Sequence, residues 1–140
     1  MELILLEQAL QITKLSPGAA IPSEVWDCAF CALTKTAEEL SLVLPETIPL
    51  GSPHIEHGWR ALQVGAQLDF NLVGVIAGIS AALAAQNIPI FVLSTYHTDY
   101  ILVKEHKLDK AVTALEEAGY TMVSSEFGMN EKTACGSFGD

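Results

Sequence analysis

The chain has 140 residues, half of them hydrophobic and 17% of them charged, which predicts well-buried domains and argues against disorder in the body of the chain. This length allows one ordinary domain or two small ones. The net charge of −10, from 17 acidic and 7 basic residues, leaves no basic cluster to bind a phosphate backbone, so nucleic acid is not expected as a partner.

No targeting or membrane segment is expected. The N-terminal Met1-Glu2 lacks the basic start of a signal peptide. The longest near-apolar run, residues 72–85, is interrupted by Ser80 and is shorter than the about 20 residues of a membrane-spanning helix. We therefore expect a soluble, cytoplasmic protein with no membrane contact, whose cysteines stay reduced.

The first half of the chain predicts short strands and one short helical piece. An apolar stretch broken near Glu7 is followed by Ser16-Pro17-Gly18, which predicts a turn. Polar residues 35–39 separate the next two apolar stretches. The predicted elements are a strand over 3–15, a helical piece over 21–27, and strands over 28–34 and 40–44.

Cys28 and Cys31 form a Cys-x-x-Cys pattern, which is typical of redox proteins when it opens a helix after a strand. Here strand-like residues follow Cys28. Positions three apart in a strand face opposite sides, so the two thiols are expected to lie apart as small core residues. A redox enzyme is the alternative, and Cys135 in the tail has no assigned role.

Residues 45–58 are rich in proline and glycine and lack periodicity, so they predict a linker. His54 and His57 within this linker resemble a pair of metal ligands. A zinc site needs three or four ligands, and no third candidate lies near them in the sequence. We therefore expect no metal and interpret both histidines as solvated loop residues.

The second half predicts helices and strands in a regular order. Gly119 predicts a C-terminal cap for the second helix, and the order β-α-β-β-α-β is the split βαβ arrangement of ferredoxin-like domains. The predicted elements are a strand over 61–64, a helix over 72–86, two strands within 88–104 joined by a polar turn over 94–99, a helix over 108–118, a strand over 120–123 and a loose tail from 124.

The two halves also share a sequence repeat, which points to duplication, although chance matches among common apolar residues are the alternative. Glu39 stands sixty positions before Asp99, and a second match aligns residues 9–12 with 61–64. The identical pairs at a spacing of sixty are Leu33 with Leu93, Leu42 with Leu102, and Val43 with Val103. The acidic residue after the turn is thus expected in both halves.

Two places in the second half have the chemistry to bind a ligand. At residues 69–74, N–H groups at the start of a helix can hold a carboxylate or phosphate, and an ordinary capped helix is the alternative. A nucleotide is disfavoured because no phosphate-loop glycine pattern is present. At residues 94–99, Asp99 either pairs with a ligand ammonium or guanidinium group or bonds within its own turn, and the pattern slightly favours the turn.

Three segments resemble a known family. LSTYHTDYILVKE at 93–105, DFNLVG at 69–74 and TAEELSLVLPE at 36–46 are similar to the ACT domains of the CASTOR arginine sensors and of small bacterial ACT proteins. The resemblance implies an α+β fold of two ferredoxin-like βαββαβ ACT modules in tandem, the first abbreviated. The expected division is 1–57 for the abbreviated module with its linker, 58–126 for the ACT domain and 127–140 for a flexible tail.

The resemblance implies a regulatory protein that binds an amino acid or a similar small effector, with no catalytic residue and no cofactor. Asp99 would face the basic side chain or amino group of the ligand. The other implied ligand-binding residues are Thr95, Tyr96 and His97 as the pocket lining, and Asn71, Leu72, Val73 and Gly74 as backbone partners of the α-carboxylate or α-amino group.

The sequence departs from the sensors in one respect. The sensors carry four ACT modules per chain, whereas this chain carries two, so a homodimer is expected to restore four. The regulated output would then lie in a partner protein that the sequence does not identify. The rival interpretation is an ACT-type assembly module that binds no ligand.

Overall fold

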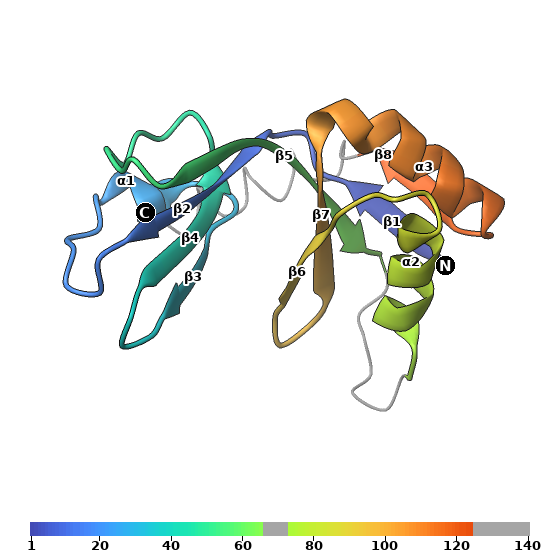
Figure 1. Cartoon of the computed structure of the whole chain (residues 1–140), viewed down its shortest axis with the longest axis horizontal. Helices are drawn as coiled ribbons and strands as arrows, with labels where there is room; N and C mark the ends of the chain where they lie inside the picture. Colours follow the sequence, from blue (N-terminus) through green and yellow to red (C-terminus); the bar gives the residue numbers. More distant parts are fainter. Residues whose placement is uncertain (66–72, 125–140) are drawn as a thin grey trace. The chain divides into compact units, whose positions relative to one another are not determined.

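The computed structural model describes residues 1–65 and 73–124, which fall into two compact units (Figure 1). Unit 1 contains Met1–Glu7 and the described residues from Arg60 onward, and unit 2 contains Gln8–Trp59. The elements of the described residues are β1 (Glu2–Leu5), β2 (Leu10–Leu15), α1 (Glu24–Asp27), β3 (Ala32–Lys35), β4 (Leu40–Pro45), β5 (Ile55–Val64), α2 (Val75–Ala84), β6 (Phe91–Ser94), β7 (Asp99–Lys104), a 3-10 turn (Glu105–Lys107), α3 (Leu108–Glu117) and β8 (Thr121–Ser124). No helix within these ranges is long and apolar enough to span a membrane.

Unit 2 is an abbreviated ferredoxin-like sheet. Its strand order is β3-β4-β2-β5, and each neighbouring pair is antiparallel. This is the strand order of a βαββαβ module, but α1 has only one turn and residues 46–54 replace the second helix between β4 and β5. Val25 from α1 is buried against Leu40, Leu42 and Leu44 of β4. The prediction of an abbreviated first module is therefore confirmed.

A buried polar network holds the segment that stands in place of the second helix. Gln11 is fully buried in β2, and its Nε2 donates hydrogen bonds to the carbonyl oxygens of Pro45 (3.0 Å) and Ile48 (2.6 Å). The Thr13 hydroxyl donates to Gln11 Oε1 at 2.5 Å. The carbonyl groups of the segment after β4 thereby find partners inside the unit, as buried polar groups must.

Gln11→Ala is expected to destabilise the protein by about 2 to 4 kcal/mol, because it leaves two carbonyl oxygens and the Thr13 hydroxyl without their buried partner. Denaturation in urea followed by circular dichroism measures the change. Gln63→Ala is the matched control, since Gln63 is only partly buried in β5. Equal losses for the two variants would contradict the role given to Gln11.

Unit 1 has five strands instead of the four of a single ferredoxin-like module. The strand order is β6-β7-β5-β1-β8. The N-terminal strand β1 lies between β5, to which it is antiparallel, and β8, to which it is parallel. Leu3 of β1 is fully buried in the core that α2 and α3 cover, together with Leu62, Ile79 and Leu115. The apolar stripe predicted for the second helix is confirmed by the buried residues Leu108, Ala111 and Leu115.

The strand pairing places the boundary between the two units at other residues than the sequence analysis expected. The apolar stretch over 3–15 does break near Glu7, but β1 joins unit 1 and β2 joins unit 2. The strand β5 starts at Ile55, so the last four residues of the expected linker, 55–58, belong to the sheet, next to β2. His57 consequently lies in a strand and not in a loop. The division falls between Trp59 and Arg60, inside β5.

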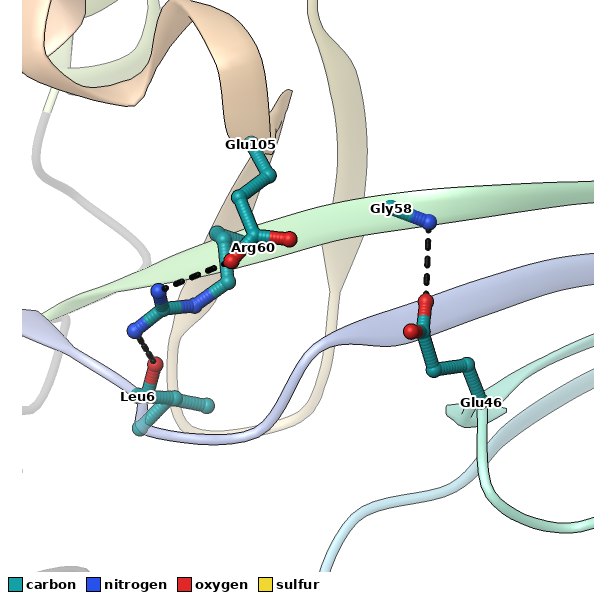
Figure 2. A network of polar contacts seen from close by, with 5 residues as sticks. All are labelled: Leu6, Glu46, Gly58, Arg60 and Glu105. Carbon is teal, nitrogen blue, oxygen red and sulfur yellow. Dashed lines mark hydrogen bonds and ion pairs between the residues drawn. The ribbon is translucent and has the colours of Figure 1, made fainter.

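Polar contacts fix the backbone on each side of that division (Figure 2). In unit 2, Glu46 Oε1 accepts a hydrogen bond from Gly58 N at 2.9 Å, where Gly58 has a φ of 75° and the β2–β5 register shifts. In unit 1, Arg60 Nη2 donates to the carbonyl oxygen of Leu6 at 2.9 Å, and Arg60 Nη1 lies 3.8 Å from Glu105 Oε1. Each bond holds a segment where the chain passes from one unit to the other.

The sequence repeat corresponds to two equivalent hairpins, but its spacing is wrong by one residue. Lys35 pairs with Leu40 in the first hairpin and Ser94 with Asp99 in the second, a spacing of 59. The cores agree, because Leu42 and Leu44 occupy in unit 2 the place of Ile101 and Val103 in unit 1. A shift of one residue reverses the faces of a strand. The expectation that Glu39 stands where Asp99 stands is therefore wrong: Leu40 does.

Candidate functional site

The turn between β6 and β7 is a four-residue loop closed by its own hydroxyl groups. Thr95 N donates to the carbonyl oxygen of Thr98 at 2.8 Å, and the Thr95 hydroxyl donates to the same oxygen at 3.1 Å. Thr98 N donates back to Thr95 Oγ1 at 3.2 Å. The turn in unit 2 repeats this scheme with Thr36 and Glu39. The hydroxyl of Thr95 is thus used to shape the turn.

Thr98 fastens this turn to the end of β5. Its side chain is buried, and its hydroxyl donates to the carbonyl oxygen of Val64 at 3.1 Å. Since β5 and β6 are both neighbours of β7, and β6 is antiparallel to it, the topology of a split βαβ unit brings the carboxyl ends of β5 and β6 to one end of the sheet. Figure 1 shows the β6–β7 turn and the first residues of α2 directed to the same end of unit 1.

Asp99 stands at the first position of β7, half-buried, beside the turn. The Ser94 hydroxyl donates to Asp99 Oδ1 at 2.6 Å, which agrees with the interpretation that the carboxylate bonds within its hairpin. A carboxylate has two oxygens and about four lone-pair sites, so this bond leaves capacity for a charged donor. The equivalent residue of unit 2, Leu40, is buried and apolar.

The aromatic residues of the turn project outward. Tyr96 is 76% exposed and meets His97 edge to face, with ring centroids 5.2 Å apart and an interplanar angle of 85°. Aromatic rings of this kind can lie against the apolar or cationic part of a ligand. The structure thus gathers Thr95, Tyr96, His97 and Asp99 on one turn.

The helix part of the predicted site is described only at Val73 and Gly74. Val73 is 94% exposed, and Gly74 has a φ of 83°, so helical backbone begins only at Val75 and not at residue 72 as predicted. Asn71 and Leu72 lie outside the described residues. Backbone N–H groups at the start of a ten-residue helix favour an anionic group.

Sequence reasoning placed Ser94 and Thr98 in the candidate turn but gave neither of them a role in the site. Ser94 orients the Asp99 carboxylate, and Thr98 ties the turn to β5. The available signal was the excess of hydroxyl residues over what a tight turn needs, but a hydroxyl that satisfies its own turn looks the same in a sequence as one that reaches a neighbouring strand.

Cys28 and Cys31 lie between α1 and β3 and not within a strand, so the prediction that a strand holds the two thiols apart is wrong. Cys28 Sγ lies 3.2 Å from the carbonyl oxygen of Phe30, in the peptide group that leads into Cys31. Burial raises the pKa of both, and that of Cys31 to about 11. At neutral pH both are therefore protonated, which is unlike the activated thiolate of a redox enzyme.

Other parts of the described chain offer no competing centre of this kind. No cluster of three or more potential metal ligands occurs among residues 1–65 and 73–124. A cavity of about 350 Å³ is lined mainly by residues of α3, and none of its lining residues was predicted as a site residue. These residues are Gln86, Asp109, Lys110, Thr113, Ala114 and Glu117.

The fold and the turn site define an α+β protein built on ferredoxin-like ACT sheets. It is similar over 88% of its length to the crystal structure of protein Atu0741 from Agobacterium tumefaciens, covering 92% of that chain with a TM-score of 0.78 and 29% identity. The regulatory subunit of aspartate kinase from Thermus thermophilus has the same fold, with a TM-score of 0.56, 13% identity, and coverage of 80% of this chain and 93% of that one.

Residues 54–117, somewhat less than half of the chain, match the model of the ACT domain family. Over 59 residues, 41% of its length, the chain is 34% identical to the human cytosolic arginine sensor for mTORC1 subunit 1 and covers 18% of that protein. The chain spans between 18% and 58% of the length of the curated relatives it matches first. The predicted resemblance to ACT domains of the CASTOR type is confirmed.

Proposed function

We propose that this protein is a regulatory sensor that binds an amino acid or a closely related small molecule at the end of unit 1. The observation that carries the proposal is the arrangement around Asp99. Its carboxylate is held by Ser94 on a turn that Thr98 anchors to β5, at the end of the sheet where α2 begins. An acidic group and a helix N-terminus at one end of a unit suit a ligand that carries both an amino and a carboxylate group.

The names of two similar proteins support the ligand class. One is called an arginine sensor, and the other is a regulatory subunit of a kinase whose substrate is an amino acid. Arginine is accordingly the first candidate, because its guanidinium group can make two parallel hydrogen bonds with a carboxylate. The ligand need not be arginine for the geometry to apply.

Each chain would hold one such site. In unit 2, Leu40 replaces Asp99 and α1 has only four residues, too few for a helix-terminus site. The equivalent turn carries Glu38 and Glu39, whose backbone N–H groups are already bonded to Thr36 Oγ1. Unit 2 would thus lack an effector site, and unit 1 would bind the effector.

A homodimer would bring together four units, two of them carrying the proposed site. Ligand binding would then act by favouring one arrangement of the subunits over another, which a partner protein detects. Sedimentation equilibrium with and without ligand measures this assembly directly. A monomer under both conditions would remove the dimer from the proposal and leave the site in unit 1 untouched.

The proposal is tested by a thermal-shift screen of the full chain against the twenty amino acids, followed by isothermal titration of every hit. We expect a rise in melting temperature that grows with ligand concentration, as binding to the native state requires, with one ligand per chain. A response confined to basic amino acids would support Asp99 as the recognition group. Silence across the panel would favour the rival function, an ACT-type assembly module without a ligand of this class.

A further inference from the structure

Cys28 and Cys31 form a side-chain pair in unit 2 that the proposed effector site does not involve. Cys28 ends α1 with an extended backbone, at φ −78° and ψ 157°. Cys31 precedes β3 and packs against the core cluster of Val25, Leu40, Leu42 and Leu44. Both cysteines are free thiols and both are partly exposed. Cys28 thus lies at the end of α1, and Cys31 packs against the sheet that α1 covers.

The segment folds back on itself and brings Cys28 Sγ to the peptide group that leads into Cys31. Cys28 Sγ lies 2.9 Å from the carbonyl oxygen of Val25 and 3.2 Å from that of Phe30. The second contact closes a tight loop immediately before Cys31. Formation of a disulfide needs the two sulfurs in direct contact, and the native fold holds Cys28 Sγ against the peptide group that leads into Cys31.

We propose that Cys28 and Cys31 are a dithiol modification site that a small-molecule disulfide, such as oxidised glutathione, converts to an intramolecular disulfide. The thiolate of one cysteine attacks the oxidant, forms a mixed disulfide and expels one thiolate. The second cysteine then attacks the sulfur of the first and expels the other thiolate. The two released thiolates take up the two protons lost by the cysteines and become two thiols, so one disulfide is consumed and one is formed.

The surroundings of the pair distinguish this site from the centre of a redox enzyme. Cys28 lies at the C-terminal end of a helix and beside Asp27, whereas a catalytic Cys-x-x-Cys stands at a helix N-terminus that stabilises the thiolate. Both thiols are protonated at neutral pH because burial raises the pKa of each. The exchange is therefore slow, and the disulfide, once formed, ties the end of α1 to the start of β3.

Peptide mapping of the folded full-length protein tests the proposal. Trypsin cuts after Lys14 and Lys35, so a single peptide, residues 15–35, carries both cysteines and excludes Cys135. After incubation with oxidised glutathione, blocking of remaining thiols and digestion, we expect this peptide to be about 2 Da lighter than the reduced peptide and to carry no blocking group. Dithiothreitol should restore both thiols.

Cys28→Ser and Cys31→Ser provide the matched controls, since each retains a single thiol that can only form a mixed disulfide with glutathione. Circular dichroism confirms that each variant is folded before the reaction. Two glutathione adducts on the wild-type peptide would overturn the proposal, because they mean that the second cysteine does not reach the first. Two unmodified thiols, under conditions where either variant is glutathionylated, would overturn it as well. Neither outcome affects the effector site of unit 1.

Discussion

Asp99→Ala is expected to weaken binding of the amino-acid effector by about 10- to 100-fold, the effect of losing a hydrogen bond between charged groups. Isothermal titration with the effector found in the screen measures the loss. The melting temperature of the unliganded protein should change little, because the Ser94–Asp99 bond that also disappears is exposed. Asp99→Asn retains the shape and removes the charge, so a cationic ligand should bind it nearly as weakly.

Glu39→Ala is the control that the structure selects for this experiment. A spacing of sixty would make Glu39 the counterpart of Asp99, but the strand pairing makes it the counterpart of Thr98 and places Leu40 at the Asp99 position. We therefore expect Glu39→Ala to bind the effector with wild-type affinity. If Glu39→Ala lost as much affinity as Asp99→Ala, general negative charge and not the turn of unit 1 would be responsible.

A fragment of residues 58–126, the module boundary suggested by the sequence, is expected not to fold into the native sheet. It lacks β1, which lies between β5 and β8 and contributes the fully buried Leu3 to the core. Without β1, β8 loses the strand with which it pairs in the described part of the chain, and the core loses a large apolar side chain. Loss of a buried leucine side chain alone costs about 2 to 5 kcal/mol. Circular dichroism and urea denaturation measure the outcome.

A synthetic peptide of residues 1–7 provides the complementary test. Added to the fragment, it should restore cooperative unfolding, whereas the same peptide with Leu3→Ala should restore much less. The result that would contradict this assignment is a fragment that unfolds cooperatively by itself with the stability of the full chain. That would mean that β8 can pair directly with β5, as in a four-stranded ferredoxin-like sheet.

The parts of the fold that the sequence predicted are those in which local pattern decides. The periodic apolar residues of α3, the cap at Gly119 and the hairpin of β6 and β7 depend on neighbours within a few positions, and the structure contains all three. The abbreviated first half was also predictable, because its helix signals are weak. The resemblance to ACT domains followed from a long contiguous motif around the turn.

The other parts depend on pairing between distant segments, which a single sequence does not encode locally. Nothing in Glu2–Leu5 indicates that it joins β5 and β8 while the adjacent β2 joins the other unit. The buried Gln11 resembles any polar residue of a strand, and its role appears only when the carbonyl oxygens of Pro45 and Ile48 reach it. Register is equally hidden, since one residue of slip separates Glu39 from the position of Asp99.

The insertion of unit 2 between β1 and the rest of unit 1 has a consequence for how the chain folds. Pairing of β1 with β5 joins residues about 60 positions apart, which is a slow step in an unstructured chain. Unit 2 is continuous from Gln8 to Trp59, and its own pairing of Leu10 with Trp59 brings the ends of that segment together. Early folding of unit 2 would thus shorten the loop that β1 must close. During synthesis, the N-terminal strand would wait for the C-terminal half to emerge.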